Sequence, residues 1–221
     1  MFKKIIIFVS NHSFSEILSK IFFVIFNYPR YLCVSIFQLG PFHMTPLKQK
    51  PYCVDIIKYL NNRTVRTSVI DIGCGLGDIL RSLRYENRYG MDHSPNVINA
   101  LNFIQLFTIA KRNRLNLSEY KFEDDELVGS YDVIIIVNFI HKFTAAFLRE
   151  KIEKIYYNNL KMGGEIIFDI VEKITQPHPY SHSVEDLNKN INVKIKVIGR
   201  YLIYLPDHND LFRQIISFKK V

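Results

Sequence analysis

The residues best suited to chemistry lie in one short stretch, 71–78, with the sequence DIGCGLGD. Three of the nine glycines stand here at every second position, directly after an apolar run, with an acid on either side. Glycines at the end of a buried strand let the chain turn sharply and let a ligand lie against bare backbone. The spacing differs from the G-x-G-x-x-G dinucleotide fingerprint and from the G-x-x-x-x-G-K-[ST] phosphate loop. A nucleotide-like ligand held in another way is therefore expected.

The elements that would position this loop follow a regular alternation. Apolar runs predict strands at 69–72, 88–91, 120–122, 131–137 and 165–171, and the periodicity predicts helices at 51–60, from 94 onward and at 144–160. Two further strand-like runs, 193–204 and 212–219, are joined by a turn at 206–210 and predict an antiparallel pair at the sheet edge. The pattern indicates an α/β fold with a doubly wound, mostly parallel seven-stranded sheet and an antiparallel C-terminal strand.

Four motifs in this order resemble those of the class I S-adenosylmethionine-dependent methyltransferases. The first is DIGCGLGD at 71–78, and the second is YGMDHSP at 89–95, with Asp92 at the end of the second strand. The third is YDVI at 131–134, and the fourth is LKMGGEI at 160–166, a turn into the fifth strand. The resemblance covers about residues 65–171 and implies a Rossmann-like methyltransferase fold, with S-adenosylmethionine as the cofactor and methyl transfer as the activity.

The resemblance also implies roles for individual residues. The glycine loop and its preceding acid would line the methionine portion of the cofactor, and Asp92 would accept hydrogen bonds from both ribose hydroxyls. An acid after the third strand would read the adenine amino group; Asp124 is the choice among Glu123, Asp124 and Asp125. Lys48, Lys50 and Tyr52 are candidates to neutralise the cofactor carboxylate. The cofactor-binding set is Asp71, Gly73, Cys74, Gly75, Gly77, Asp92, Asp124 and Asn138.

Catalysis needs little from the protein, because a sulfonium is an activated methyl donor that must mainly be aligned and kept from water. A general base is required only for a poorly acidic hydroxyl. His141, just after the fourth strand, is the best-placed candidate, and packing beside the cofactor is the alternative for it. His178 and His182 follow the fifth strand and are read as ordinary loop residues or as substrate contacts. No clustered set of His and acids indicates a metal site.

The charge is concentrated at the N-terminus. The chain has 221 residues and a net charge of +8, and residues 1–66 hold nine Lys and Arg against two Asp and Glu, hence +7. Residues 1–50 form an apolar, basic extension with a helix expected at 14–25, and residues 51–221 form the cofactor-binding domain. The extension would cap the pocket or, through residues 1–37, contact an anionic membrane surface.

The three cysteines, Cys33, Cys53 and Cys74, have no metal-ligand spacing and favour a reducing compartment. The apolar run near the N-terminus is interrupted too early for a secretory signal, and charged and proline residues interrupt the only stretch long enough for a spanning helix. A cytoplasmic protein is expected, with peripheral contact at the inner face of a membrane as an option.

Some methyl acceptors can be argued against. The N/D-P-P-Y/F/W element of amino-methylating nucleic acid enzymes is replaced here by Asn138-Phe139-Ile140-His141, and no Pro-Cys pair serves pyrimidine chemistry. No nucleic-acid-binding module is recognisable, so specific nucleic acid binding is not expected. The favoured acceptor is an oxygen or nitrogen of a small molecule, including a sugar or lipid-linked precursor. The alternatives are a non-catalytic cofactor-binding scaffold, a methyltransferase acting on RNA or protein, and a nicotinamide-dependent oxidoreductase, which the glycine spacing disfavours.

Overall fold

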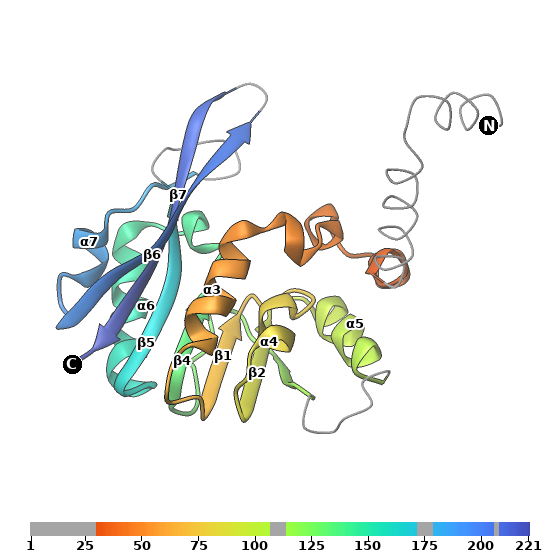
Figure 1. Cartoon of the computed structure of the whole chain (residues 1–221), viewed down its shortest axis with the longest axis horizontal. Helices are drawn as coiled ribbons and strands as arrows, with labels where there is room; N and C mark the ends of the chain where they lie inside the picture. The colour runs from red at the N-terminus through yellow and green to blue at the C-terminus, as the bar shows by residue number, and fades with distance from the viewer. Residues whose placement is uncertain (1–29, 107–113, 172–178, 206–207) are drawn as a thin grey trace. The chain divides into compact units, whose positions relative to one another are not determined.

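The computed structural model describes residues 30–106, 114–171, 179–205 and 208–221 (Figure 1). The helix expected at 14–25 lies outside these residues, as does His178. The chain divides into two compact units, Met1–Pro46 and Leu47–Val221. In the first unit, residues 30–36 are helical and a 3-10 helix, η1, spans Pro41–Met44. The Arg30 guanidinium donates to the carbonyl oxygen of His43 at 2.7 Å and ties the two together.

The second unit is built on a seven-stranded sheet in the order β3-β2-β1-β4-β5-β7-β6. Strands β1 to β5 are mutually parallel, and β7 is antiparallel to both β5 and β6. The order reverses at β1, which lies between β2 and β4, so the carboxyl ends of β1, β2 and β4 meet at a topological switch point. The strands are β1 Ser68–Ile72, β2 Asn87–Asp92, β3 Asn116–Glu119, β4 Tyr131–Ile136, β5 Leu160–Val171, β6 Val193–Leu205 and β7 His208–Lys220.

The helices alternate with the parallel strands as the sequence pattern predicts. Thr144 caps α6 because its hydroxyl accepts from the N–H of Phe147 at 3.3 Å, and Pro51 and Pro95 occupy the first turns of α3 and α5. The helices of this unit are η2 Leu47–Gln49, α3 Pro51–Asn61, α4 Asp78–Ser82, α5 Pro95–Leu106, η4 Ile140–Lys142, α6 Ala145–Asn158 and α7 Val184–Asn188.

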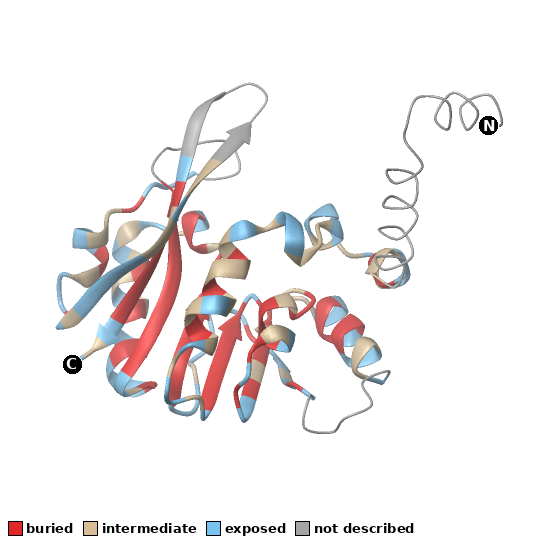
Figure 2. Cartoon of the chain, viewed as in Figure 1, coloured by how far each residue is buried: buried red, intermediate tan, exposed pale blue. Residues whose placement is uncertain are grey.

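Alternate residues of each central strand pack into two different layers. Val69, Val133 and Ile135 pack with α3, α4 and α5, whereas Ile70 and Ile134 pack with α6 and α7. Strands covered on both faces read as continuous apolar runs, which is why β1 and β4 were legible in the sequence. Figure 2 shows β1, β4 and β5 largely buried, and β6 at the edge with much of its length exposed.

Several predicted elements had the wrong bounds; for example, the last strand was expected to begin at 212, after a turn at 206–210, but β7 begins at His208. The third strand was expected at 120–122 but spans Asn116–Glu119, and Tyr120 and Phe122 are buried after its end. Leu160 was expected to end a helix and begin a turn; it instead pairs with Tyr131 as the first residue of β5. The expected turn is an irregularity inside β5, because the β4–β5 register shifts between Tyr131 and Val133.

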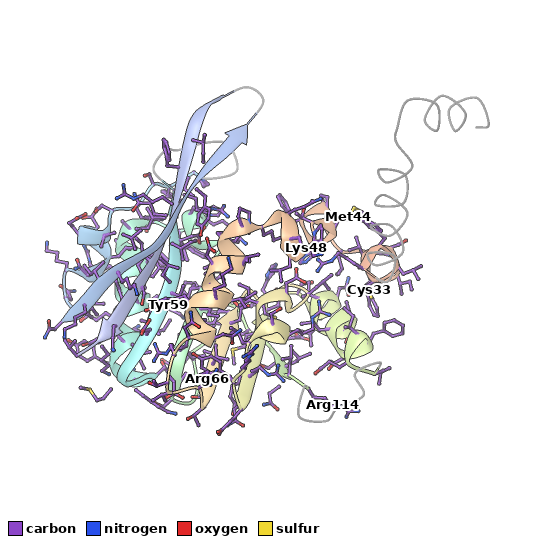
Figure 3. All side chains as sticks on the ribbon, in the orientation of Figure 1. Cys33, Met44, Lys48, Tyr59, Arg66 and Arg114 are labelled. Atoms are coloured by element: carbon purple, nitrogen blue, oxygen red, sulfur yellow. The ribbon has the colours of Figure 1, made fainter. Side chains whose placement is uncertain are left out.

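Helix α3 is fixed to the sheet by polar contacts along its length. The Tyr59 hydroxyl donates to Oε2 of buried Glu165 on β5 at 2.6 Å, and Arg63 forms an ion pair with the same carboxylate. Nearer its start, Asp55 accepts from the Tyr201 hydroxyl on β6 at 2.6 Å. Figure 3 shows Tyr59 toward the end of α3 that is remote from Lys48. These contacts fix the first turn of α3 beside the carboxyl edge of the sheet.

Candidate cofactor site

The glycine loop turns back directly after β1 and is held by the end of β2. The backbone N–H groups of Gly73 and Cys74 both donate to the carbonyl oxygen of Met91, at 2.7 and 2.9 Å. Gly73, Gly75 and Gly77 have φ values of 75°, 52° and 67°, in the left-handed region that L side chains rarely adopt. The loop therefore has a positive φ at every second residue, and a glycine occupies each of these positions.

Gly73 is also required by close packing. A Cβ added there would lie 2.9 Å from two ring atoms of Phe139, the second residue after β4's apolar run. The Phe139 ring belongs to an aromatic group with Phe122, Phe143 and Phe147, with centroid separations of 5.1 to 6.2 Å between contacting rings. An apolar wall thus runs from the start of the glycine loop across the carboxyl ends of β4 and β3.

Asp92 is the last residue of β2, and its carboxylate is oriented by backbone donors. Gly75 N–H donates to Oδ2 at 3.1 Å, and Ser94 N–H donates to Oδ1 at 3.0 Å. His93 Nδ1 lies 3.3 Å from Oδ1. An ionised carboxylate has about four acceptor positions, so further donors can still be accepted. The loop and the end of β2 therefore form one rigid unit around a carboxylate that can bind a diol.

Asp71 lies within β1, two residues before Gly73, and is 3 % exposed. Among the described residues, its Oδ1 has no hydrogen-bond partner. Burial raises the pKa of Asp71 well above its ordinary value, and the nearby carboxylates of Asp92 and Asp78 raise it further. A buried acceptor beside two other acids fits a ligand that brings a cationic group or hydrogen-bond donors.

Cys74 takes part through its position in the loop and not through its sulfur. The thiol is buried in the layer under α3 and α4, where burial raises its pKa well above the ordinary value. Its Sγ lies 3.1 Å from where a Cβ would stand on Gly90. The structure therefore places the Cys74 side chain in the core.

The three residues expected to neutralise an anionic end of the ligand are placed differently. Lys50 immediately precedes α3, and its Nζ lies 3.6 Å from Oδ2 of Asp78, which follows the glycine loop. Lys48 lies on η2. Tyr52, on the first turn of α3, reaches Asn138 at the end of β4, whose Nδ2 donates to the tyrosine oxygen at 2.7 Å. Tyr52 and Asn138 were predicted independently, and the fold brings them together.

Two functional candidates on this side were missed by sequence reasoning. Arg213 on β7 donates from NH1 to Asn138 Oδ1 at 2.6 Å, and its Nε lies 3.3 Å from Oδ2 of Asp169 on β5. The Asp169 Oδ1 accepts from the backbone N–H of Asn138 at 2.7 Å. A charged residue inside each of two apolar strands was the available signal, because such residues are rarely buried without a partner.

The three acids after β3, which are the candidates to read the adenine amino group, differ in their contacts. The Asp125 carboxylate accepts from the N–H of Lys121 at 2.6 Å and so closes the local turn. Glu123 and Asp124 lie within that turn, and both are exposed. Tyr120 N–H donates to the carbonyl oxygen of Asp92 at 3.0 Å, which keeps this segment beside the end of β2. The adenine-reading role of Asp124 stays a prediction.

Both described histidines near the carboxyl edge are buried. His141 lies on η4 and its carbonyl oxygen accepts from Tyr180 N–H at 3.2 Å, so residue 180 is held next to the end of β4. His182 is also buried, and burial lowers its pKa below the ordinary value. The catalytic role of His141 stays a prediction.

Neither a cluster of metal-ligand side chains nor a membrane-spanning helix is present among the described residues. No group of three or more His, Cys, Asp or Glu side chains in 30–106, 114–171, 179–205 and 208–221 is arranged to hold a metal ion. Among the helices in the described part of the chain, none has the length and apolarity needed to cross a membrane.

Comparison with known proteins agrees with the geometry. A family model described as a methyltransferase domain matches residues 70–166, from β1 into β5. No curated protein sequence matches the chain. Because the sequence identities to the solved structures are low, their similarity to this chain supports the fold alone.

Magnesium protoporphyrin IX methyltransferase (ChlM) from Synechocystis PCC 6803, solved with bound SAH (S-adenosylhomocysteine), has a TM-score of 0.62 at 15% identity over 80% of this chain and 89% of that one. N-methyltransferase NodS from Bradyrhizobium japonicum WM9 has a TM-score of 0.57 at 12% identity over 78% and 96%. TehB from Haemophilus influenzae has a TM-score of 0.60 at 15% identity over 77% and 62%, so the match spans less than two thirds of TehB.

The family match covers both carboxylates and the whole glycine loop, and the strand order with its antiparallel β7 is that of the matched structures. Residues 70–166 belong to a methyltransferase domain family, and the second unit has the fold of the class I S-adenosylmethionine-dependent methyltransferases.

Proposed function

We propose that this protein transfers the methyl group of S-adenosylmethionine to an oxygen or nitrogen of a small molecule. The observation that carries the proposal is the pair of buried carboxylates at the switch point. Asp92 is aimed by two backbone donors, and Asp71 presents an acceptor with no partner among the described residues. Both lie around a loop whose glycines leave its backbone bare.

The residues present fit the ribose and the methionine portion of this cofactor. Asp92, on β2, would accept from the ribose hydroxyls, and Asp71, on β1, would face the positively charged amino and sulfonium end. Asn138 follows β4, on the far side of β1 from Asp92, and Tyr52 on α3 contacts it; the two would hold the carboxylate of the methionine portion. When bound, the sulfonium supplies an activated methyl group that a nucleophile takes directly.

The chain's own contribution is to align the acceptor and to exclude water. The aromatic group of Phe122, Phe139, Phe143 and Phe147 provides an apolar wall at the carboxyl edge, where ligands bind in these sheets. His141 is the candidate base for a hydroxyl acceptor, because an imidazole can hold a proton near neutral pH. ChlM, named for methyl transfer to magnesium protoporphyrin IX, further supports the small-molecule class, and NodS, named an N-methyltransferase, supports nitrogen as an acceptor atom.

The test is transfer of a labelled methyl group. Purified protein would be incubated with methyl-labelled S-adenosylmethionine and hydroxyl- or amine-bearing metabolites, sugars and lipid-linked sugars, with RNA and protein fractions in parallel, and Asp92→Ala as the control. Label in a small molecule, lost in the variant, is the expected result. Label only in RNA or protein would overturn the acceptor class, and no label in any fraction would overturn the proposed activity.

A further inference from the structure

Arg213 and Asp169 form an ion pair in the interior, on adjacent antiparallel strands. Their side chains are 9 % and 0 % exposed, and Nε lies 3.3 Å from Oδ2. Removing two charges from water costs free energy that their mutual attraction only partly returns, so a buried pair is weak evidence of stabilisation by itself. Its other contacts indicate what it does.

Both members of the pair hold Asn138. The Asp169 carboxylate accepts from the backbone N–H of Asn138, and the Arg213 guanidinium donates to its side-chain oxygen. Asn138 has a φ of 73°, a left-handed conformation that costs free energy in any L residue, although asparagine tolerates it better than most. One contact fixes the backbone of Asn138 and the other fixes its side chain.

The arginine also determines which way the Asn138 amide points. A guanidinium has only donors, so the atom facing it must be the amide oxygen, and the NH₂ group must face Tyr52. The tyrosine oxygen then accepts from Nδ2 at 2.7 Å, and its own proton is left with the longer contact of 3.1 Å to an oxygen that Arg213 already occupies. The donor contact of the Tyr52 hydroxyl to Asn138 is thus the weaker of the two, and a ligand carboxylate can compete for its proton.

The ring of Tyr52 is held by the same arginine, whose guanidinium carbon lies 4.8 Å from the ring centroid. Burial raises the pKa of the Tyr52 hydroxyl above its ordinary value, so it remains a donor at neutral pH. The four groups thus form a chain of contacts from Asp169 through Arg213 and Asn138 to Tyr52.

The place of this chain relative to the glycine loop indicates its target. Strand β1 lies between β2 and β4, with Ile72 opposite Ile136, so the loop starting at Gly73 runs beside Asn138. A ligand whose ribose is held by Asp92 and which crosses the loop would bring its other end to Asn138 and Tyr52.

We propose that Arg213 and Asp169 are positioning residues that fix Asn138 and orient the Tyr52 hydroxyl toward the carboxylate of the methionine portion of bound cofactor. The inference rests on the proposed function. Neither residue touches the ligand: Asp169 acts through Asn138, and Arg213 acts through Asn138 and the Tyr52 ring.

The test compares two ligands by calorimetry: S-adenosylhomocysteine and 5′-methylthioadenosine, which shares the adenosyl thioether but has no amino acid portion. Arg213→Met is expected to weaken S-adenosylhomocysteine binding about tenfold, the loss of a hydrogen bond to a charged group, and to leave methylthioadenosine binding unchanged. Adding Arg213→Met to Tyr52→Phe should cause little further loss, because the two act in one chain of contacts. Arg200→Met, an exposed arginine on β6, is the matched control and should bind like the wild type.

A second variant covers the case in which Arg213→Met fails to fold, since it leaves Asp169 buried without its partner. Arg213→Met/Asp169→Leu removes both charges, and circular dichroism and thermal melting would confirm its fold. It should show the same selective loss for S-adenosylhomocysteine. Equal loss for both ligands, or no loss for either, would overturn the positioning role. Failure of the wild type to bind either ligand would instead overturn the proposed function, and the inference with it.

Discussion

At the scale of the single residue, Asp71 lies in an environment that opposes its ionisation. Its carboxyl group is buried, lies near two other acids and has an oxygen without a partner among the described residues. Such an arrangement costs stability in the free protein and is relieved by a cationic ligand. Site residues that are unfavourable for folding alone are a common consequence of function.

Asp71→Asn is therefore expected to stabilise the free protein at neutral pH and to weaken S-adenosylmethionine binding. The folded-state pKa of Asp71 is raised, so the unfolded chain loses its proton first and stability falls as pH rises through that interval. Asp71→Asn has no ionisable group at this position, so its stability does not fall in this way as the pH rises. At pH 7 its Tm should exceed that of the wild type by about 2–4 °C, corresponding to about 1 kcal/mol in a chain of this size.

Thermal melts of both proteins from pH 4 to pH 8, without ligand, would measure this difference. It should shrink toward pH 4, because this is close to the unfolded-state pKa of about 3.9 and the unfolded chain no longer gains much from losing the proton. A Tm difference that is the same at every pH would contradict the claim that ionisation of Asp71 destabilises the free protein.

At the scale of the element, the continuously buried strands were the most legible in the sequence, and the largely exposed β3 was misplaced. β1, β4 and β5 were legible because helices cover both of their faces. β3, at the sheet edge, has the sequence NLSE with three exposed residues, so no apolar signal marks it. The apolar Tyr120 and Phe122 beyond it misled the assignment, because apolar residues mark burial and not backbone pairing.

The parts of the site that local motifs encode were predictable from the sequence, and the part that depends on long-range strand pairing was not. The loop and Asp92 follow from local motifs, because a turn needs its glycines at fixed spacing. Arg213 is far from Asn138 in sequence, and their contact depends on β7 inserting between β5 and β6. No local pattern encodes that pairing.

One element-scale prediction concerns the amino ends of the strands, where Asp132 on β4 is hydrogen-bonded to Ser68 on β1. Its Oδ2 accepts from the N–H and the hydroxyl of Ser68, at 2.7 and 2.8 Å, and lies 3.3 Å from Lys161 Nζ. Burial opposes ionisation of Asp132, but the hydrogen bonds from Ser68 and Lys161 outweigh it, and the net effect lowers its pKa. Asp132→Asn should destabilise the protein by about 1 kcal/mol at pH 7.

The sign of the pH dependence is opposite to that of Asp71. A lowered folded-state pKa contributes stability above the unfolded value, about 3.9, and this stability is lost as pH falls through the folded value. Urea unfolding at pH 7 and at lower pH should show the difference between wild type and variant closing on acidification. Glu150→Gln, an exposed acid on α6, is the control and should change little. A gap that widens in acid would be inconsistent with this role of Asp132.

A second element-scale prediction tests how β2 packs under the site. A Cβ on Gly90 would lie 2.9 Å from Leu117 and 3.1 Å from both Cys74 and Leu80. Gly90→Ala should cost about 1–3 kcal/mol through overpacking of this layer. Gly40→Ala is the matched control, because nothing lies within 4 Å of its added methyl group. Equal thermal stability of the two variants would show that the layer accommodates the extra methyl group.

At the scale of the whole molecule, most of the net charge of +8 lies in residues 1–66. The apolar and basic composition of residues 1–37 predicts contact with an anionic membrane surface. The full chain should sediment with vesicles containing anionic lipid, less so at high salt, and a variant without residues 1–28 should stay in the supernatant while still binding S-adenosylhomocysteine. Unchanged vesicle binding after the deletion would count against membrane contact by this segment.

The measurement that tests the central claim most directly is calorimetric titration of the purified protein with S-adenosylhomocysteine, alongside Asp92→Ala and with NAD as a control ligand. The account predicts that the wild type binds S-adenosylhomocysteine and does not bind NAD. It also predicts that the variant, well folded by circular dichroism, loses the binding because the ribose hydroxyls have no acceptor. A variant that binds as tightly as the wild type, or a folded wild type that binds only NAD, would contradict it.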